Sequence, residues 1–305
     1  MKIYDCFPFF NENDLLELRI NQHWDYFDKF IIVEAGETHT GLKKPFNFDH
    51  ERFKKYKSKI IYRNFDCFQE EINKFPGLLD AYSLSDRTAA GQHTSDWVRD
   101  HFQGNYFVKV LSDLDAHDHD IVYASSVDEV LNEEGFKKGL AVFTENKDKL
   151  FSLKRGGSPV VGPNDAPIKS RPTFGFILDL YVYKYNLFHK SIPVAQMTEF
   201  GVHKNILPST MRGLSLGTHI NIQDAGWHFT YLDNAGGERV LEKQKSWAHS
   251  RDRLPNQRVK FLNTTKEQAL QRMFQDYDVK KVNITRNTHP KYLIENLEKY
   301  KDYIL

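Results

Sequence analysis

The first 65 residues alternate between short apolar runs and a stretch with helical spacing. One apolar run begins in KIYDC and ends near Asp5, a second lies in DKFIIVEAG and carries Glu34 near its end, and a third lies in KSKIIYRNF. Between the first two, apolar residues from Leu15 to Ile20 recur at a spacing typical of a helix that begins after an Asn or Asp cap. This order predicts an α/β domain with a largely parallel sheet.

Two segments resemble the Asp-x-Asp signature of metal-dependent sugar transfer. Asp113-Leu114-Asp115 follows apolar positions at helical steps from Thr94 to Leu114, so we expect it in a solvated loop at the end of a helix. Ser126-Val127-Asp128 follows the short apolar strand DIVYA. Because ligands of parallel α/β sheets bind beyond the carboxyl ends of the strands, position favours the second segment.

The second half of the chain is less regular. LKRGGSPVVGPNDAPIKSRP, rich in Pro and Gly, predicts a long loop, and TFGFILDLYVYKYNLF fits either a strand or a helix. From Asn263 to Leu305 we expect two amphipathic helices, the last with Pro290 in its first turn.

Composition narrows the function classes. The chain is 40% hydrophobic and 14% aromatic, which excludes disorder, and its formal charge of +1 gives no basic excess for stable nucleic-acid binding. Two cysteines are too few for a disulfide framework. Neither an apolar run long enough to span a membrane nor a signal-peptide pattern occurs, so we expect a cytoplasmic protein without a transmembrane segment.

Several segments, in this order, resemble glycosyltransferase family 17, the family of the bisecting N-acetylglucosaminyltransferase. They include the start of the chain, the segment after the second apolar run, the strand-end motif and a late Gly-Trp-His motif. In sequence letters they are IYDCFPFFNENDLLELRINQ, IIVEAGETHTGLKKPFNF, SSVDEV, YKYNLF, the lone Arg212, DAGWHFTYL, KSWAH and HPKYLIENLEKYKDYIL.

The resemblance implies a GT-A-type α/β fold and an inverting hexosyltransferase that uses a UDP-sugar. We expect one domain over 1–305, with a Rossmann-like nucleotide-sugar half at 1–132 and an acceptor half with C-terminal helices at 133–305. Two departures from the family pattern stand out. Ser126 replaces the first acid of the strand-end motif, and Gly104 stands where the family tends to have Arg.

A diphosphate leaving group needs positive charge, which a divalent cation held by carboxylates can supply. We expect Asp128 and His228 to hold Mn²⁺ or Mg²⁺, with Ser126 beside the diphosphate; His249 is the competing histidine. Because a hydroxyl is a weak ligand for a hard cation, the metal is either loosely held or dispensable. A metal-free site would use Lys or Arg, and Arg212 ranks before Lys154, Arg155 and Lys204.

Inversion needs a general base, for which Asp224 ranks first, with Glu129 and Glu199 as the alternatives. Asp5 and Glu34 are candidate ligands of the uracil or ribose, and capping of the strand ends is the competing role.

The leading hypothesis is therefore transfer of a sugar, GlcNAc or another hexose, from a UDP-sugar to a hydroxyl of a glycan or polysaccharide. The alternative is a non-catalytic module on the same fold that binds a sugar nucleotide or a glycan. A weaker third possibility, sugar transfer to nucleic-acid bases, has the near-neutral charge against it.

Overall fold

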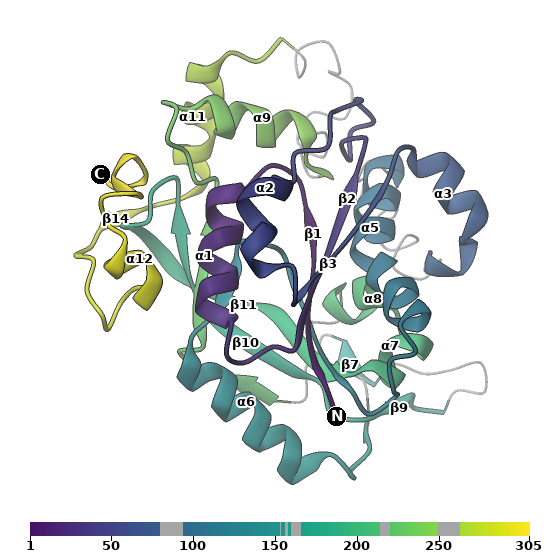
Figure 1. Ribbon diagram of the computed structural model, residues 1–305. Coiled ribbons are helices and arrows are strands. Elements are labelled where there is room, and N and C mark those ends of the chain that lie inside the picture. The colour runs from purple at the N-terminus through teal and green to yellow at the C-terminus, as the bar shows by residue number, and fades with distance from the viewer. Residues whose placement is uncertain (80–93, 153, 156–157, 160–165, 214–219, 249–262) are drawn as a thin grey trace.

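A ten-stranded sheet forms the centre of the protein (Figure 1). Five of its nine strand pairings are parallel, which confirms the predicted α/β fold with a mostly parallel sheet. The computed structural model describes residues 1–79, 94–152, 154–155, 158–159, 166–213, 220–248 and 263–305.

Four parallel strands from the first half of the chain stand side by side in the order β3-β2-β1-β4. The sheet then continues through β11, β10, β13 and β5, while β12 pairs with β10 and β14 with β11. The strands are β1 Ile3–Phe9, β2 Lys29–Ala35, β3 Ile60–Phe65, β4 Ile121–Ala124, β5 Glu129–Leu131, β10 Phe174–Val182, β11 Leu187–Glu199, β12 Ile220–Ile222, β13 Gly226–Thr230 and β14 Lys280–Lys281.

Both faces of the parallel part are covered by helices. Phe7 of β1 belongs to the core cluster that contains Leu16 of α1, whereas its neighbour Cys6 belongs to the cluster that contains Phe102 of α5. The α-helices are α1 Asn13–His23, α2 His50–Phe53, α3 Phe68–Lys74, α5 Thr94–Asp113, α6 Glu133–Asn146, α7 Phe200–Asn205, α8 Pro208–Gly213, α9 Glu238–Ser246, α11 Lys266–Asp276 and α12 Lys291–Glu295.

The ambiguous apolar segment after residue 172 is strand β10, and the long loop before it contains short two-residue strands. These short strands form two small separate sheets, in which β6 pairs with β9 and β7 pairs with β8. They are β6 Phe151–Ser152, β7 Lys154–Arg155, β8 Ser158–Pro159 and β9 Lys169–Ser170.

Two predicted boundaries are wrong. Strand β1 does not end near Asp5 but continues to Phe9, because Cys6, Phe7 and Phe9 are all buried and the strand stays in register with β2. Asp5 therefore lies inside the sheet and not at its edge.

The second C-terminal helix, α12, has only five residues, with Pro290 as its N-cap. The chain then turns, because Tyr300 and Tyr303 pack into a core cluster with Tyr185 and their hydroxyls bond to Asp14 of α1. Tertiary packing here overrides the helical spacing. The other C-terminal helix, α11, forms as predicted and begins with a capping box at Thr265.

Candidate functional site

A cavity of about 490 Å³ opens beyond the carboxyl ends of the parallel strands. Phe10 follows β1, His39 follows β2, and Ser126 and Asp128 follow β4. Arg212, His228 and Lys243 from the second half of the chain complete the same wall. The volume is within the usual range for small-molecule sites, and the position is where open α/β sheets bind ligands.

Asp128 is a buried carboxylate at this wall, with a side chain that is 9% exposed. Its Oδ2 accepts a hydrogen bond from Lys243 Nζ at 3.1 Å and lies 3.5 Å from His228 Nε2. Burial by itself would raise the pKa of Asp128, but the charges of Lys243 and His228 outweigh burial and hold that pKa well below its usual range. Asp128 is thus an anion whose partner is already in place.

Glu129 is fully buried beside Asp128 and is also paired. One carboxylate oxygen forms an ion pair with Arg212, and the other accepts a hydrogen bond from the Ser126 backbone N–H at 2.8 Å. Arg212, whose side chain is 41% exposed, comes from α8 and lines the cavity. The structure therefore brings together five residues that the sequence placed at the site: Ser126, Asp128, Glu129, Arg212 and His228.

Arg19 of α1 is hydrogen-bonded to the loop that carries Asp128. Its guanidinium donates to the backbone carbonyls of Ser126 at 2.5 Å and Glu129 at 2.8 Å, and to Ser125 Oγ at 2.5 Å. A fully buried fork of N–H donors that binds two loop carbonyls fixes the path of the backbone between them. Arg19 therefore positions Asp128 without lining the cavity itself.

Gly226 allows β13 to approach β5 closely enough to place His228. Its φ is +147°, and a Cβ at this position would lie 2.1 Å from the carbonyl oxygen of Val130. With the glycine in place, His228 pairs with Glu129 across the two strands. The Gly-Trp-His motif thus has a steric reason for its glycine.

Asp5 lies in the core, 0% exposed and away from the cavity lining. It accepts hydrogen bonds from Arg19 at 2.5 and 3.0 Å and contacts His23 Nδ1 at 2.8 Å. His23 Nε2 in turn accepts from the Leu131 backbone N–H at 2.8 Å. Asp5 therefore holds Arg19 and His23, the two side chains that support the loop carrying Asp128. The sequence predicted a contact with the nucleotide instead, but Asp5 does not line the cavity.

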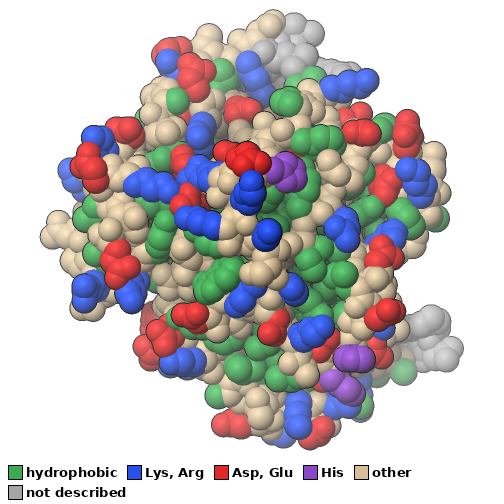
Figure 2. All heavy atoms as spheres, in the orientation of Figure 1, with side chains coloured by type: hydrophobic (Ala, Val, Ile, Leu, Met, Phe, Trp, Pro, Cys, Tyr) green, Lys and Arg blue, Asp and Glu red, His purple; other side chains and the backbone are tan. Residues whose placement is uncertain are grey.

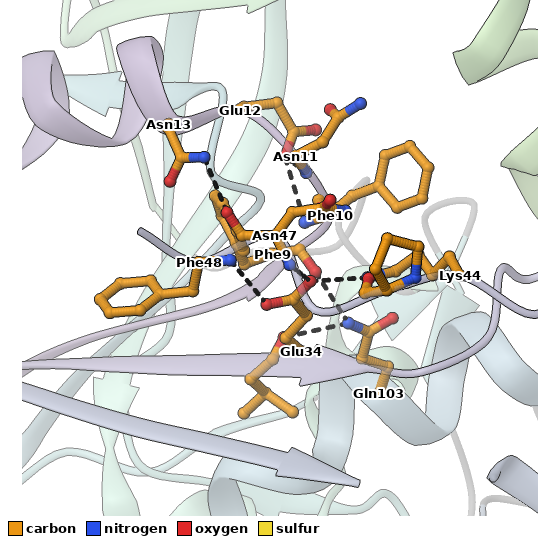
Figure 3. Close-up of polar contacts among 12 residues, drawn as sticks. Phe9, Phe10, Asn11, Glu12, Asn13, Glu34, Lys44, Asn47, Phe48 and Gln103 are labelled. Carbon is orange, nitrogen blue, oxygen red and sulfur yellow. Dashed lines mark hydrogen bonds and ion pairs between the residues drawn. The ribbon is translucent and has the colours of Figure 1, made fainter. Parts of the chain in front are cut away.

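Glu34 is also 0% exposed and accepts hydrogen bonds from four donors, of which those of Lys44, Asn47 and Phe48 can be followed in Figure 3. They are the Lys44 ammonium at 2.6 Å, the Tyr62 hydroxyl at 2.9 Å and the backbone N–H groups of Asn47 and Phe48 at 2.7 and 3.2 Å. Lys44 itself lines the cavity, whereas Glu34 does not. This arrangement matches the competing role foreseen for Glu34, since the carboxylate organises the segment that follows β2.

Helix α5 contributes a polar segment to the opposite wall. The Gln103 side chain donates to the carbonyls of Phe9 and Val33 near the ends of β1 and β2 (Figure 3). Its Oε1 also lies 2.9 Å from His39 Nε2. Gly104 is on the cavity lining, and nothing lies within 4 Å of a Cβ added there. Where the family tends to have Arg, this chain leaves open space.

Three other candidates lie away from the cavity lining. Asp224 is exposed in the turn before β13, with φ +52°, and Glu199 at the end of β11 pairs with His119 at 3.1 Å. Lys204 is exposed and pairs with Asp118 at 2.6 Å. His249 and the side chains of Lys154 and Arg155 are outside the described residues. The predicted loop acids Asp113 and Asp115 are exposed at the end of α5, as expected.

Lys243 is the residue that sequence reasoning missed. It lies on α9, two positions before the KSWAH segment, and lines the cavity together with Ser246 and Trp247. Lys243 and Ser246 are three residues apart on α9 and therefore lie on one helix face, which was a usable signal, and Trp247 follows directly as the C-cap of the helix. Burial by itself would lower the pKa of Lys243, but the Asp128 carboxylate outweighs burial and raises it, so the ammonium stays charged.

A metal ion fits these residues poorly. Asp128, Glu129 and His228 offer three ligand atoms within 4.8 Å of one another, the one such group of acids and histidines among the described residues. Both carboxylates, however, already carry a cationic partner, Lys243 or Arg212. Ligating histidines also bond through their other ring nitrogen, yet His228 Nδ1 is buried with no hydrogen-bond partner in the described part of the chain.

None of the helices described in the structure is long and apolar enough to cross a membrane. Basic and acidic side chains are interspersed over the face shown in Figure 2, where the charges of both signs alternate and no broad basic stripe is seen.

Comparison with known proteins gives one family match, over the first part of the chain. No curated protein matches the chain. A solved structure described as 4-diphosphocytidyl-2C-methyl-D-erythritol synthase is similar over 73% of this chain and 88% of its own, at 9% identity and a TM-score of 0.35, which is too distant to inform function. The family model described as glycosyltransferase family 17 matches residues 1–138, which include β1 to β5 and the loop with Asp128. The match spans somewhat less than half of the chain, and it supports a transferase enzyme.

Proposed function

We propose that the protein transfers a hexose, with inversion, from a UDP-sugar to a hydroxyl group of a glycan or polysaccharide. The observation that carries the proposal is the cavity beyond β1, β2 and β4, with the paired residues Asp128 and Lys243 in its wall. The family match over residues 1–138 supports the reaction class. The donor nucleotide, the acceptor and the cytoplasmic location expected from the sequence are parts of the proposal.

The reaction is a displacement at the anomeric carbon of the donor sugar. The acceptor oxygen attacks the anomeric carbon, the bond from that carbon to the diphosphate oxygen breaks, and UDP leaves with the bonding electron pair. Lys243 and Arg212 line the cavity and offer positive charge for the leaving diphosphate.

The proton of the acceptor hydroxyl passes to a carboxylate. Asp224, the base ranked first from the sequence, lies outside the cavity lining. Among the described residues, three carboxylates line the cavity besides Asp128 and Glu129, and we propose that one of them is the base: Glu12, Glu37 and Asp100.

A non-catalytic module that binds a sugar nucleotide or a glycan is the second candidate, and Ser126 is the observation that favours it. The loop has a neutral hydroxyl where an Asp-x-Asp signature has its first carboxylate. A module of this kind would bind UDP-sugars without turning them over.

Release of UDP from a panel of UDP-hexoses separates the two. The protein is incubated with each donor and with glycan acceptors, and UDP is measured over time beside the Asp128→Asn variant. Acceptor-stimulated UDP release by the wild type, reduced in the variant, supports transfer. Binding of a UDP-sugar without release or transfer, for every donor in the panel, would leave the binding module as the function.

A further inference from the structure

We propose that Lys243 takes the electrostatic place of the divalent cation, so that the donor diphosphate is bound without a metal. The inference rests on the proposed function, because it concerns the diphosphate of the same donor. In sugar transfer by a metal-dependent enzyme, the cation acts as a Lewis acid and a template at the diphosphate. An ammonium fixed at that position supplies charge and a hydrogen bond in its stead.

The position of the Lys243 ammonium is fixed by two acceptors. Nζ donates to Asp128 Oδ2 and to Thr230 Oγ1, both at 3.1 Å, and its side chain is 26% exposed at the cavity wall. The rings of Tyr231 and Trp247 lie 5.2 and 5.8 Å from Nζ. An ammonium has three N–H donors, so these bonds leave one for a ligand in the cavity.

The charges immediately around Asp128 leave no net negative charge there to hold a divalent cation. Asp128 and Glu129 contribute two negative charges, and Lys243 and Arg212 two positive charges, so the four side chains sum to zero. A divalent cation that used both carboxylates would have to displace both cations or be added to them. A diphosphate, by contrast, brings the negative charge that two cations at the edge of a cavity attract.

Ser126 and Lys243 make sense as a pair. Compared with an Asp-x-Asp signature, the loop has Ser126 in place of the first carboxylate. The remaining carboxylate, Asp128, accepts a hydrogen bond from Lys243. Both changes lower the negative charge that would hold a hard cation, and both act at the same place. If the Lys243 ammonium supplies the positive charge that a metal would supply, then replacing both Ser126 and Lys243 should make UDP binding depend on a divalent cation.

The test is the affinity for UDP, measured by titration calorimetry in EDTA and in excess Mn²⁺. The proteins are the wild type, Lys243→Met, the double variant Ser126→Asp with Lys243→Met, and Lys204→Met. Lys204→Met is the matched control, since it removes one lysine charge that lies off the cavity lining. Circular dichroism of each variant establishes that it is folded.

The wild type and Lys204→Met are expected to bind UDP equally well in EDTA and in Mn²⁺. Lys243→Met should lose about 10- to 100-fold in affinity in EDTA, the usual size of a lost hydrogen bond to a charged group. The double variant should bind UDP only with Mn²⁺.

UDP binding by the wild type that requires Mn²⁺, or unchanged binding by Lys243→Met, would overturn the inference and leave the proposed function standing. A wild type that binds no UDP or UDP-sugar under either condition would overturn both.

Discussion

Two buried carboxylates in this protein have the same kinds of partner and different surroundings. Asp5 is paired with Arg19 and His23, and Asp128 with Lys243 and His228. Around Asp5 all three side chains are 0% exposed, whereas Lys243 is 26% exposed at the wall of the cavity. One group is closed on all sides, and the other presents its cation to a space that a ligand can enter.

The difference shows what turns a buried ion pair into a binding site. Arg19 donates to Asp5, to Ser125 Oγ and to the backbone carbonyls of Ser126 and Glu129, so none of its five N–H groups remains for a ligand. Lys243 bonds to Asp128 and Thr230 and keeps a donor for the cavity. The first pair therefore stabilises the loop, and the second acts on what the loop binds.

The largest expected effect is the loss of stability when the closed pair is broken. Arg19→Met leaves Asp5 charged, buried and without its main partner, which should reduce the free energy of unfolding by about 3–5 kcal/mol. Chemical denaturation measures the change. A loss below about 1 kcal/mol would mean that the pair contributes little and that the two sites differ less than the geometry indicates.

Breaking the open pair should affect activity more than stability. Asp128→Asn keeps an oxygen that can accept from Lys243, so we expect a loss of about 1 kcal/mol in unfolding free energy. UDP release should fall by about 100-fold or more, because a neutral amide oxygen holds the ammonium much less firmly than the carboxylate does where the diphosphate binds. The comparison fails if this variant unfolds as readily as Arg19→Met while the fraction that stays folded keeps full activity.

Acid should weaken both sites. The pKa of Asp5 and that of Asp128 are lowered in the folded protein by their cationic partners, against the effect of burial. Such a group adds stability above its unfolded pKa of about 3.9, and this stability is lost as the pH falls below that value. Asp128→Asn should therefore lose less stability than the wild type between pH 5 and pH 3 in denaturation curves. Parallel losses in the two proteins would contradict the lowered pKa of Asp128.

The smallest effect is expected at the segment that has the letters of the signature. Asp113 and Asp115 are exposed at the end of α5, and Asp113 forms an ion pair with Lys109 on the same helix. Replacing both by Asn should change stability by no more than about 0.5 kcal/mol and leave UDP release unchanged. A large loss of activity would move the site from the loop at Asp128 to this helix end.

The placement of the strand-end loop was predictable from the sequence, because alternation of apolar runs fixes which residues follow a strand. The same reasoning placed Asp5 at the edge of the sheet and failed there. Nothing in KIYDCFPFF signals that β1 continues through Pro8 to Phe9; its length depends on pairing with β2.

Contacts between distant segments were not predictable from one sequence. Lys243 is 115 residues from Asp128, and the two meet because β13 and α9 fold back over the loop after β4. The lysine does lie on α9 just before the KSWAH segment, so it could have been proposed as a residue of a site. Its partner could not, since pairing across the sheet is a property of the whole fold.

A crystal structure of the protein with UDP, grown in EDTA, tests the central claim most directly. The account predicts the nucleotide in the cavity beyond β1, β2 and β4, with a phosphate oxygen within about 2.7–3.2 Å of Lys243 Nζ and no metal between Asp128 and the diphosphate. A UDP bound elsewhere, or a diphosphate that approaches Asp128 only through a divalent cation in crystals grown with Mn²⁺, would contradict it.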